Sequence, residues 1–137
     1  MSTAAIETGV YTLLNVSSVT TLAAGGVHRN KAPQGTGDAT VVIFAFSSGD
    51  DVKVLGGPAW LNTTFDVRAV CVGLSTAPAD AAYAAAHVLL EGAGLTVSGF
   101  TTMYCQRTGL LSYDEDAEGG KTFQHVGGTY RIMVDPT

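Results

Sequence analysis

Three residues near the C-terminus, Gly120, Lys121 and Thr122, stand in the order in which a phosphate-binding loop ends. Such a loop has the pattern G-x-x-x-x-G-K-[ST] between a strand and a helix, so that backbone N–H groups surround the phosphates. Here Glu115 occupies the place of the first glycine, and the residues that follow it are rich in acids, which would repel a phosphate. The pattern after Thr122 is that of a strand. The sequence therefore argues against a nucleotide site.

The acids that precede this triplet could instead bind a cation. They are Asp114, Glu115, Asp116 and Glu118. A calcium loop needs alternating oxygen ligands, a glycine at the sharp bend and a closing glutamate. The alternation is present, but the closing glutamate is absent and the paired glycines come too late. We expect no metal and no cofactor, and we interpret the segment as an acidic hairpin loop between two strands.

Candidate catalytic residues are few. Ser75 lies in GLSTA, residues 73–77, where a hydrolase would place its G-x-S-x-G turn. Ala77 replaces the second glycine, and neither His87 nor His125 has a recognisable catalytic context. Ser75 and Thr76 are therefore interpreted as helix caps, and His87 as a residue on the helix surface. The three histidines and two cysteines include no close ligand pair of the kind that zinc sites use. The expectation is a protein that is not an enzyme.

Much of the positive charge is concentrated in one loop, HRNKAPQGTGD, residues 28–38. The residues that could take part in a contact there are His28, Arg29, Lys31, Pro33 and Gln34. Two interpretations stay open. The loop either docks on an acidic neighbour or is an ordinary surface loop.

The composition limits the class of protein. The 137 residues fit one domain, 1–137, and the 14% charged residues fall well below the roughly 25% of ordinary soluble domains, so partners are expected to cover part of the surface. A net charge of −5 argues against general adhesion to nucleic acid or anionic membrane. Cys71 and Cys105 are expected to be reduced core residues. Without a targeting segment or a membrane-spanning run, the chain is expected to be soluble and made in a cytoplasm.

The elements that must position these residues follow from periodicity. Apolar spacing predicts a helix over residues 3–14, a short helical turn near residues 19–24, and an alanine-rich helix between Ser75 and Gly92. Strands are predicted over residues 40–46, 60–74, 100–111 and 122–134, with residues 52–58 either a loop or an edge strand. The prediction is an α+β fold with two layers, in which two helices pack on a mainly antiparallel sheet of four to five strands.

Three stretches carry a resemblance to a known family. They are LLNVSSVTTLAAGGVHRNKAPQGTGDATVVIFAF, TTFDVRAVCVGLSTAPADAAYAAAHVLL, and an acidic hairpin followed by TFQHVGGTYRIMV. In spacing and punctuation, over nearly the full length, the chain resembles the tail terminator or tail completion proteins of long-tailed bacteriophages. It departs from the family at Ala39 and Thr40, where a proline and an aromatic residue would be expected, which concerns the loop more than the fold.

The resemblance implies a structural virion protein without a reaction. Such a protein forms a hexameric ring that caps the head-proximal end of the tail tube and ends tube polymerisation. The ring joins the tail to head-completion or connector proteins and lets DNA pass without specific binding. The expected location is the virion tail, after assembly in the host cytoplasm.

Within such a ring the two charged segments acquire candidate roles. The acids at 114–118 either face the lumen or a ring face, where they would keep DNA from sticking, or form a solvated tip on the outside. The 28–38 loop could dock on the next subunit or on the tube. Alternatives to the terminator are a tail-tube or head–tail joining protein of related fold, and a small monomeric binding module or enzyme.

Overall fold

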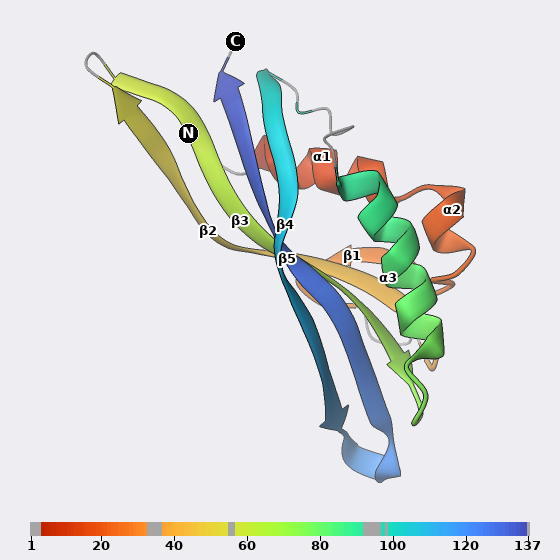
Figure 1. Cartoon of the computed structure of the whole chain (residues 1–137). Helices are drawn as coiled ribbons and strands as arrows, with labels where there is room; N and C mark the ends of the chain where they lie inside the picture. The colour runs from red at the N-terminus through yellow and green to blue at the C-terminus, as the bar shows by residue number, and fades with distance from the viewer. Residues whose placement is uncertain (1–3, 33–36, 55–56, 92–96, 98, 137) are drawn as a thin grey trace.

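The protein is a twisted five-stranded sheet with its helices on one face (Figure 1). The computed structural model describes residues 4–32, 37–54, 57–91, 97 and 99–136, apart from the side chains at 48–54, 57–60, 100, 103, 118 and 136. In chain order the elements are α1 (Ala4–Leu14), α2 (Ser17–Thr20), β1 (Val27–Arg29), β2 (Val41–Val54), β3 (Gly57–Val72), α3 (Ala77–Leu90), β4 (Phe100–Asp116), the 3-10 turn η1 (Glu118–Gly120) and β5 (Thr122–Pro136).

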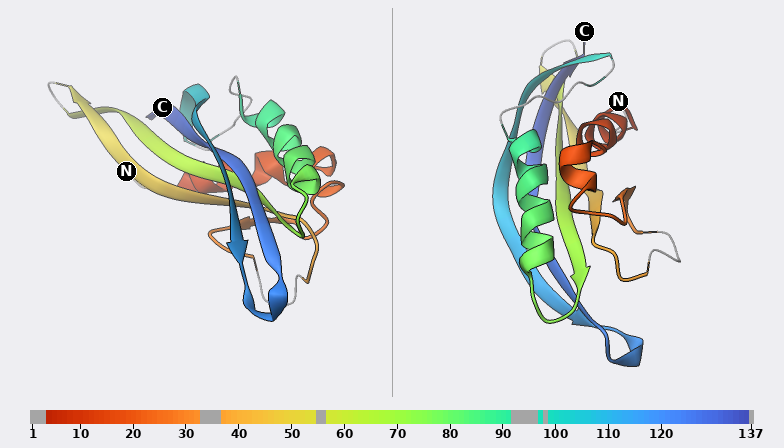
Figure 2. Two further views of the ribbon diagram at one scale, coloured as in Figure 1. Left: turned by 60° about the horizontal axis from the view of Figure 1, so that its bottom comes forward. Right: turned by 90° about the vertical axis from the view of Figure 1, so that its right-hand side faces the viewer.

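The strand order is β1-β2-β3-β5-β4. The short β1 runs parallel to β2, and all the other neighbours are antiparallel. The β2–β3 and β4–β5 strand pairs extend past the helices at opposite ends of the molecule (Figure 1), and the right-hand view in Figure 2 looks onto the helices in front of the sheet. The predicted α+β fold with two layers and a mainly antiparallel sheet is confirmed. The short helical turn predicted near residues 19–24 is present as α2, which begins and ends earlier, at Ser17–Thr20.

The two longer helices bury the faces that the sequence predicts. In α1, Ile6, Val10 and Leu14 recur every four residues and are fully buried. In α3, small residues such as Ala82 and Ala86 face the sheet, which lets the helix lie close to it. Periodicity therefore predicted both contacts correctly.

The strand β2 is longer than the sequence predicts. Residues 47–51, SSGDD, have the composition of a turn, yet β2 continues through them to Val54. The strand passes this segment with a register shift between Phe46 and Ser48 and remains paired with the long β3 throughout. Cross-strand pairing thus overrides local composition, and residues 52–54 and 57–58 are strand rather than loop.

The core on the helix side of the sheet centres on a row of aromatic rings. Phe65 is fully buried and stacks between Phe46 and Tyr130, with ring centroids 5.1 and 5.7 Å apart. Phe44 meets Phe46 edge to face. Aromatic pairs in these geometries stabilise a core beyond their buried area, so this row fastens three adjacent strands together.

The two cysteines are free and buried, as predicted. Burial, with a smaller contribution from the Glu91 carboxylate, raises the pKa of the Cys105 thiol to about 12. Because the thiolate is the reactive form, this thiol is inert at neutral pH.

Successive side chains of β3 point to opposite faces of the sheet, as the alternation of apolar and polar residues in this strand predicts. Phe65 and Val67 point toward the helices, whereas Asp66 and Arg68 lie on the opposite face. That opposite face is not uniformly polar. A second, smaller cluster of buried apolar residues lies there, formed by Val41, Ile43 and Val70 with Ala32 and Phe123 against it.

Candidate functional site

The acidic segment forms the end of the β4–β5 hairpin, which projects beyond the helical layer (Figure 1). At the turn, Gly119 and Gly120 have φ angles of 80° and 76°, in the left-handed region that glycine adopts without strain. After the turn the chain enters β5, where a phosphate loop requires a helix. The triplet at 120–122 therefore closes a hairpin.

Side-chain contacts hold this hairpin in place. The Thr122 hydroxyl donates to the Asp116 carboxylate, with 3.2 Å between Oγ1 and Oδ1. The Lys121 ammonium lies 2.7 Å from Asp38 Oδ1 and so connects the hairpin to the loop before β2. Lys121 and Thr122, which suggested a phosphate-binding loop in the sequence, thus make structural contacts within the subunit.

The acids of the hairpin do not all point the same way. Asp114 and Asp116 alternate with Glu115 along β4, so Glu115 lies on the sheet face opposite to the other two. Its Oε1 is 3.2 Å from Nε2 of His125, although its side chain is 62% exposed. The side chain of Glu118 is outside the described part. Whether the hairpin faces a lumen stays a prediction.

In the basic loop, two of the candidate contact residues have partners within the subunit. His28 Nε2 is 2.6 Å from the carbonyl oxygen of Gly25 and closes the turn before β1. Arg29 Nε is 2.9 Å from Glu7 Oε2, which ties β1 to α1. These side chains stabilise the fold, whatever they contact in an assembly.

The remaining candidates of this loop differ. Lys31 is exposed and lines a pocket on the sheet. Pro33 and Gln34 lie outside the described residues. Of the three basic or histidine side chains in the loop, Lys31 is thus the one for which neither an ion pair nor a side-chain hydrogen bond is present among the described residues.

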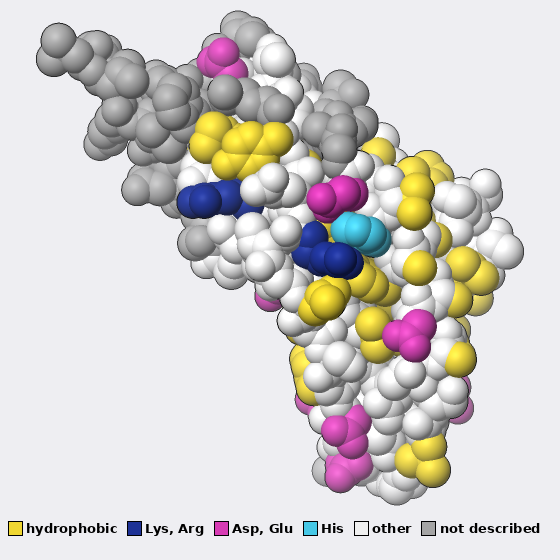
Figure 3. Space-filling view, in the orientation of Figure 1, with side chains coloured by type: hydrophobic (Ala, Val, Ile, Leu, Met, Phe, Trp, Pro, Cys, Tyr) yellow, Lys and Arg dark blue, Asp and Glu magenta, His cyan; other side chains and the backbone are white. Residues whose placement is uncertain are grey.

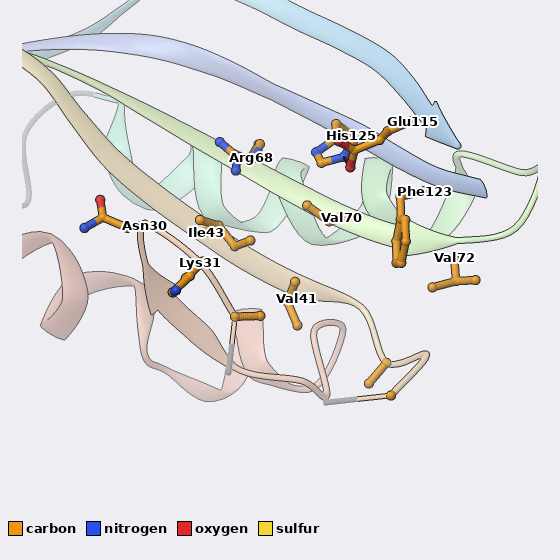
Figure 4. Close-up of a pocket in the computed structure, with 13 residues that line it drawn as sticks. Asn30, Lys31, Val41, Ile43, Arg68, Val70, Val72, Glu115, Phe123 and His125 are labelled. Atoms are coloured by element: carbon orange, nitrogen blue, oxygen red, sulfur yellow. Dashed lines mark hydrogen bonds and ion pairs between the residues drawn. The ribbon is translucent and has the colours of Figure 1, made fainter. Parts of the chain in front are cut away.

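A pocket of about 260 Å³ lies on the sheet face opposite to the helices, beside the loop that follows β1. Its apolar floor consists of Val41, Ile43, Val70, Val72 and Phe123. Its polar wall includes Asn30, Lys31, Arg68, Glu115 and His125. Figure 4 shows these side chains on the near side of the sheet, with α3 behind it.

Two nitrogen atoms in the pocket wall, Arg68 Nε and His125 Nδ1, are buried without a hydrogen-bond partner among the described residues. His125 is only 7% exposed, and its ring stacks on Tyr113 with centroids 4.3 Å apart. No ion pair is present for Arg68 or Lys31 within the described ranges. A buried polar group left unpaired costs about 1–3 kcal/mol, so the wall is suited to a group that accepts hydrogen bonds.

A second polar cluster joins α3 to the sheet on the helix side. The hydroxyl of Tyr130 is 2.7 Å from both the Tyr83 hydroxyl and His87 Nδ1, and Arg107 Nη1 donates to Tyr83 at 3.3 Å. Glu91 accepts a hydrogen bond from the backbone N–H of Arg107. Burial, followed by the hydrogen bond with Tyr83, raises the pKa of Tyr130. Since its members pair with one another, the cluster holds α3 in place.

This cluster corrects one interpretation. The sequence suggests a surface position for His87, yet its side chain is 26% exposed and bonded to Tyr130. In Figure 3 charged and histidine side chains meet near the centre of this face, and apolar side chains lie over α3. The acidic side chains at the lower end of the view lie over the β4–β5 hairpin.

Sequence reasoning missed the pocket, although one signal for it was present. Residues 40–46 are apolar on both faces, which predicts a strand covered on both sides. The helices cover one of these faces, and Val41 and Ile43 on the other form the pocket floor.

In the described part of the chain, no group of three or more histidine, cysteine or acidic side chains is arranged to hold a metal ion. None of the helices in the same residues is long and apolar enough to cross a membrane.

The architecture, a small α+β domain with one helical layer on a twisted antiparallel sheet, occurs in solved structures. One is a chain of the "Virion of native gene transfer agent (GTA) particle", which matches with a TM-score of 0.73 and 21% identity over 96% of each chain. A second solved chain matches with a TM-score of 0.61 and 12% identity, also over 96% of each chain.

At these identities the matches establish a shared fold over nearly the whole chain. No protein-family model matches the sequence, and no curated protein matches it either.

Proposed function

We propose that the protein is a structural virion component that assembles into a ring of six copies at the head-proximal end of a phage-like tail. The ring caps the tail tube, ends its polymerisation, and joins it to head-completion or connector proteins while DNA passes through. The role involves no reaction. The observation that carries the proposal is the fold match, over 96% of each chain, to a chain of a gene transfer agent virion, together with the sequence resemblance to tail terminators.

The physical character of the surface supports assembly. Only 14% of the residues are charged, and two different surfaces, the pocket on one face of the sheet and the alanine-rich α3 on the other, are open in a single subunit. A ring with rotational symmetry needs two different surfaces of this kind, because each subunit contacts its two neighbours through different patches.

The ring itself is tested by the mass of the purified full chain in solution. We expect a closed species of about 85 kDa, which is six copies of the 14.1 kDa chain, in native mass spectrometry and as rings in electron micrographs. Long tubes would instead identify a tail-tube protein. A monomer that persists at high concentration and binds no tail protein would contradict the proposal and favour a small binding module or enzyme.

The acidic hairpin gives a second test. Six copies of a −5 chain carry about −30 at neutral pH, and a lumen of this sign would not hold DNA phosphates. With Asp114 and Asp116 replaced by lysine, rings should still form, but DNA ejection from virions that carry the variant should slow by about tenfold or more, since new cations bind phosphates.

The control for this test is Asp135→Lys, the same kind of charge change near the opposite end of the β4–β5 pair. It should leave ejection unchanged. Normal ejection from the hairpin variant would show that the hairpin lies outside the lumen.

A further inference from the structure

The outward side of α3 is apolar where a surface helix is normally polar. Its exposed residues are Ala77, Pro78, Asp80, Ala81, Ala84 and Val88, followed by the exposed C-cap Glu91, and we call this set the α3 stripe. These residues recur every three or four positions and so lie on one side of the helix. Val88 is 76% exposed, and Figure 3 shows the apolar side chains over α3. Because the inward face is apolar as well, the helix has the pattern of one that is covered on both sides.

The pocket has the apolar surface and the cations that could bind this stripe. Its floor is apolar, and its wall holds Arg68 and Lys31, for which the described residues provide no ion pair. It also holds the buried His125, whose Nδ1 has no partner there. The stripe presents an apolar surface with two carboxylates, Asp80 in its first turn and Glu91 at its end. Glu91 accepts the backbone N–H of Arg107 through Oε2, which leaves its Oε1 for a further donor. The Glu115 carboxylate in the same wall lies against His125, so Arg68 and Lys31 remain to complement the carboxylates of the stripe, and the two apolar surfaces match each other.

The pocket has room for a few side chains. A volume of about 260 Å³ is below the roughly 300–1,000 Å³ of typical small-molecule sites. Val88 is the one large apolar side chain of the stripe, and Glu91 follows it by three positions. One helical turn can therefore supply an apolar group for the floor and a carboxylate for the cations.

The stripe and the pocket cannot meet within one subunit, because α3 lies behind the sheet when the pocket faces the viewer (Figure 4). In a ring, however, two different surfaces of neighbouring copies meet. We propose that the α3 stripe of one copy docks in the pocket of the next, with Val88 on the apolar floor and Glu91 accepting hydrogen bonds from Arg68 and Lys31. This contact rests on the proposed ring and identifies the partner surfaces within it.

Charge exchange tests the contact. One variant carries Lys31→Glu and Arg68→Glu, a second carries Asp80→Lys and Glu91→Lys, and a third carries all four changes. Each double variant should raise the concentration needed for half-maximal assembly by about tenfold or more, and the fourfold variant should regain most of the loss. Asp135→Lys serves as the control and should assemble like the wild type.

Disulfide trapping provides an independent readout if the Arg68 change impairs folding. Val88→Cys on α3 and Ala39→Cys, which lines the pocket, can be combined in one chain whose natural cysteines are both buried. Mild oxidation should then link neighbouring copies into a ladder that ends at the closed ring. Either single cysteine variant alone should remain unlinked.

The outcomes separate the contact from the ring. The contact would be overturned, and the ring left intact, if both double variants assembled into rings like the wild type and the double-cysteine variant formed no disulfide. Pocket variants that still form rings but no longer bind a tail tube or connector protein would also overturn it. A wild-type monomer at all concentrations would overturn both, whereas open tubes that respond to charge exchange would support the contact and contradict the ring.

Discussion

Replacing Gly127 with alanine is expected to destabilise the folded protein by about 3 kcal/mol or more. A Cβ atom at this position would lie 2.1 Å from the carbonyl oxygen of Val67 and 2.6 Å from the Cα of Arg68. Both atoms belong to the backbone of β3, the central partner of β5, so they cannot move without shifting the strand pair. Overpacking a well-packed region costs about 1–3 kcal/mol, and the cost lies at the upper end or above it when the obstacle is backbone.

The free energy of unfolding from urea titration measures this effect, and Gly109→Ala is the matched control. Gly109 lies in the same sheet, on β4, and an added Cβ there would meet nothing within 4 Å. Its replacement should change the free energy of unfolding by no more than about 0.5 kcal/mol. Equal unfolding midpoints for Gly127→Ala and the wild type would show that β3 and β5 can separate at low cost.

The same close approach shapes the pocket. Gly127 pairs with Arg68 across the two strands, on the face where the pocket lies. Without a side chain at 127, the Arg68 side chain has room beside β5, and its Nε reaches its buried, unpartnered position. A Gly127→Ala variant that still folds should therefore also assemble less well if the pocket is a subunit contact.

Local sequence patterns predicted the layers of this fold because the layers follow from periodicity. The spacing of four in α1 and the alternation in β3 depend only on neighbouring residues, and both describe the buried faces correctly. The hairpin was predicted in the same way, since paired glycines between two strand patterns favour a turn. Its loop is shorter than predicted, because β4 continues through residues 112–116, where pairing with β5 makes the acids part of the strand.

The pocket and the polar cluster could not be predicted from local patterns, because they depend on strand pairing over long distances. His87 meets Tyr130 across 43 positions in the chain, and His125 lies beside Arg68 only because of the register of β3 against β5. The pairing of β2 and β4 with their neighbours also contains bulges, such as the one between Arg107 and Gly109. Local composition does not specify where a bulge shifts the register. A polar residue is therefore placed correctly only when its distant partner is known.

The second large effect is expected for Phe65→Ala, which should lower the free energy of unfolding by about 3–5 kcal/mol. Phe65 is fully buried in β3 and stacks on Phe46 and on Tyr130. Its removal opens a cavity at the centre of the aromatic row and takes the stacked partner from both neighbouring rings, which keep their ring contacts with Phe44 and His87. The surrounding strands are fixed by pairing on both sides of β3, so they can relax into the cavity only partly.

Leu110→Ala is the control for this variant, because Leu110 is a large apolar residue of the same sheet that is 73% exposed, and its replacement should cost about 0.5 kcal/mol or less. If the protein assembles, subunit contacts add a stabilisation that depends on concentration, so all variants must be compared at one concentration below the assembly threshold. Under that condition the difference between the two variants reports the core alone. A loss of less than about 1 kcal/mol for Phe65→Ala would mean that the sheet can close over the cavity, and that the aromatic row does not fasten the strands together.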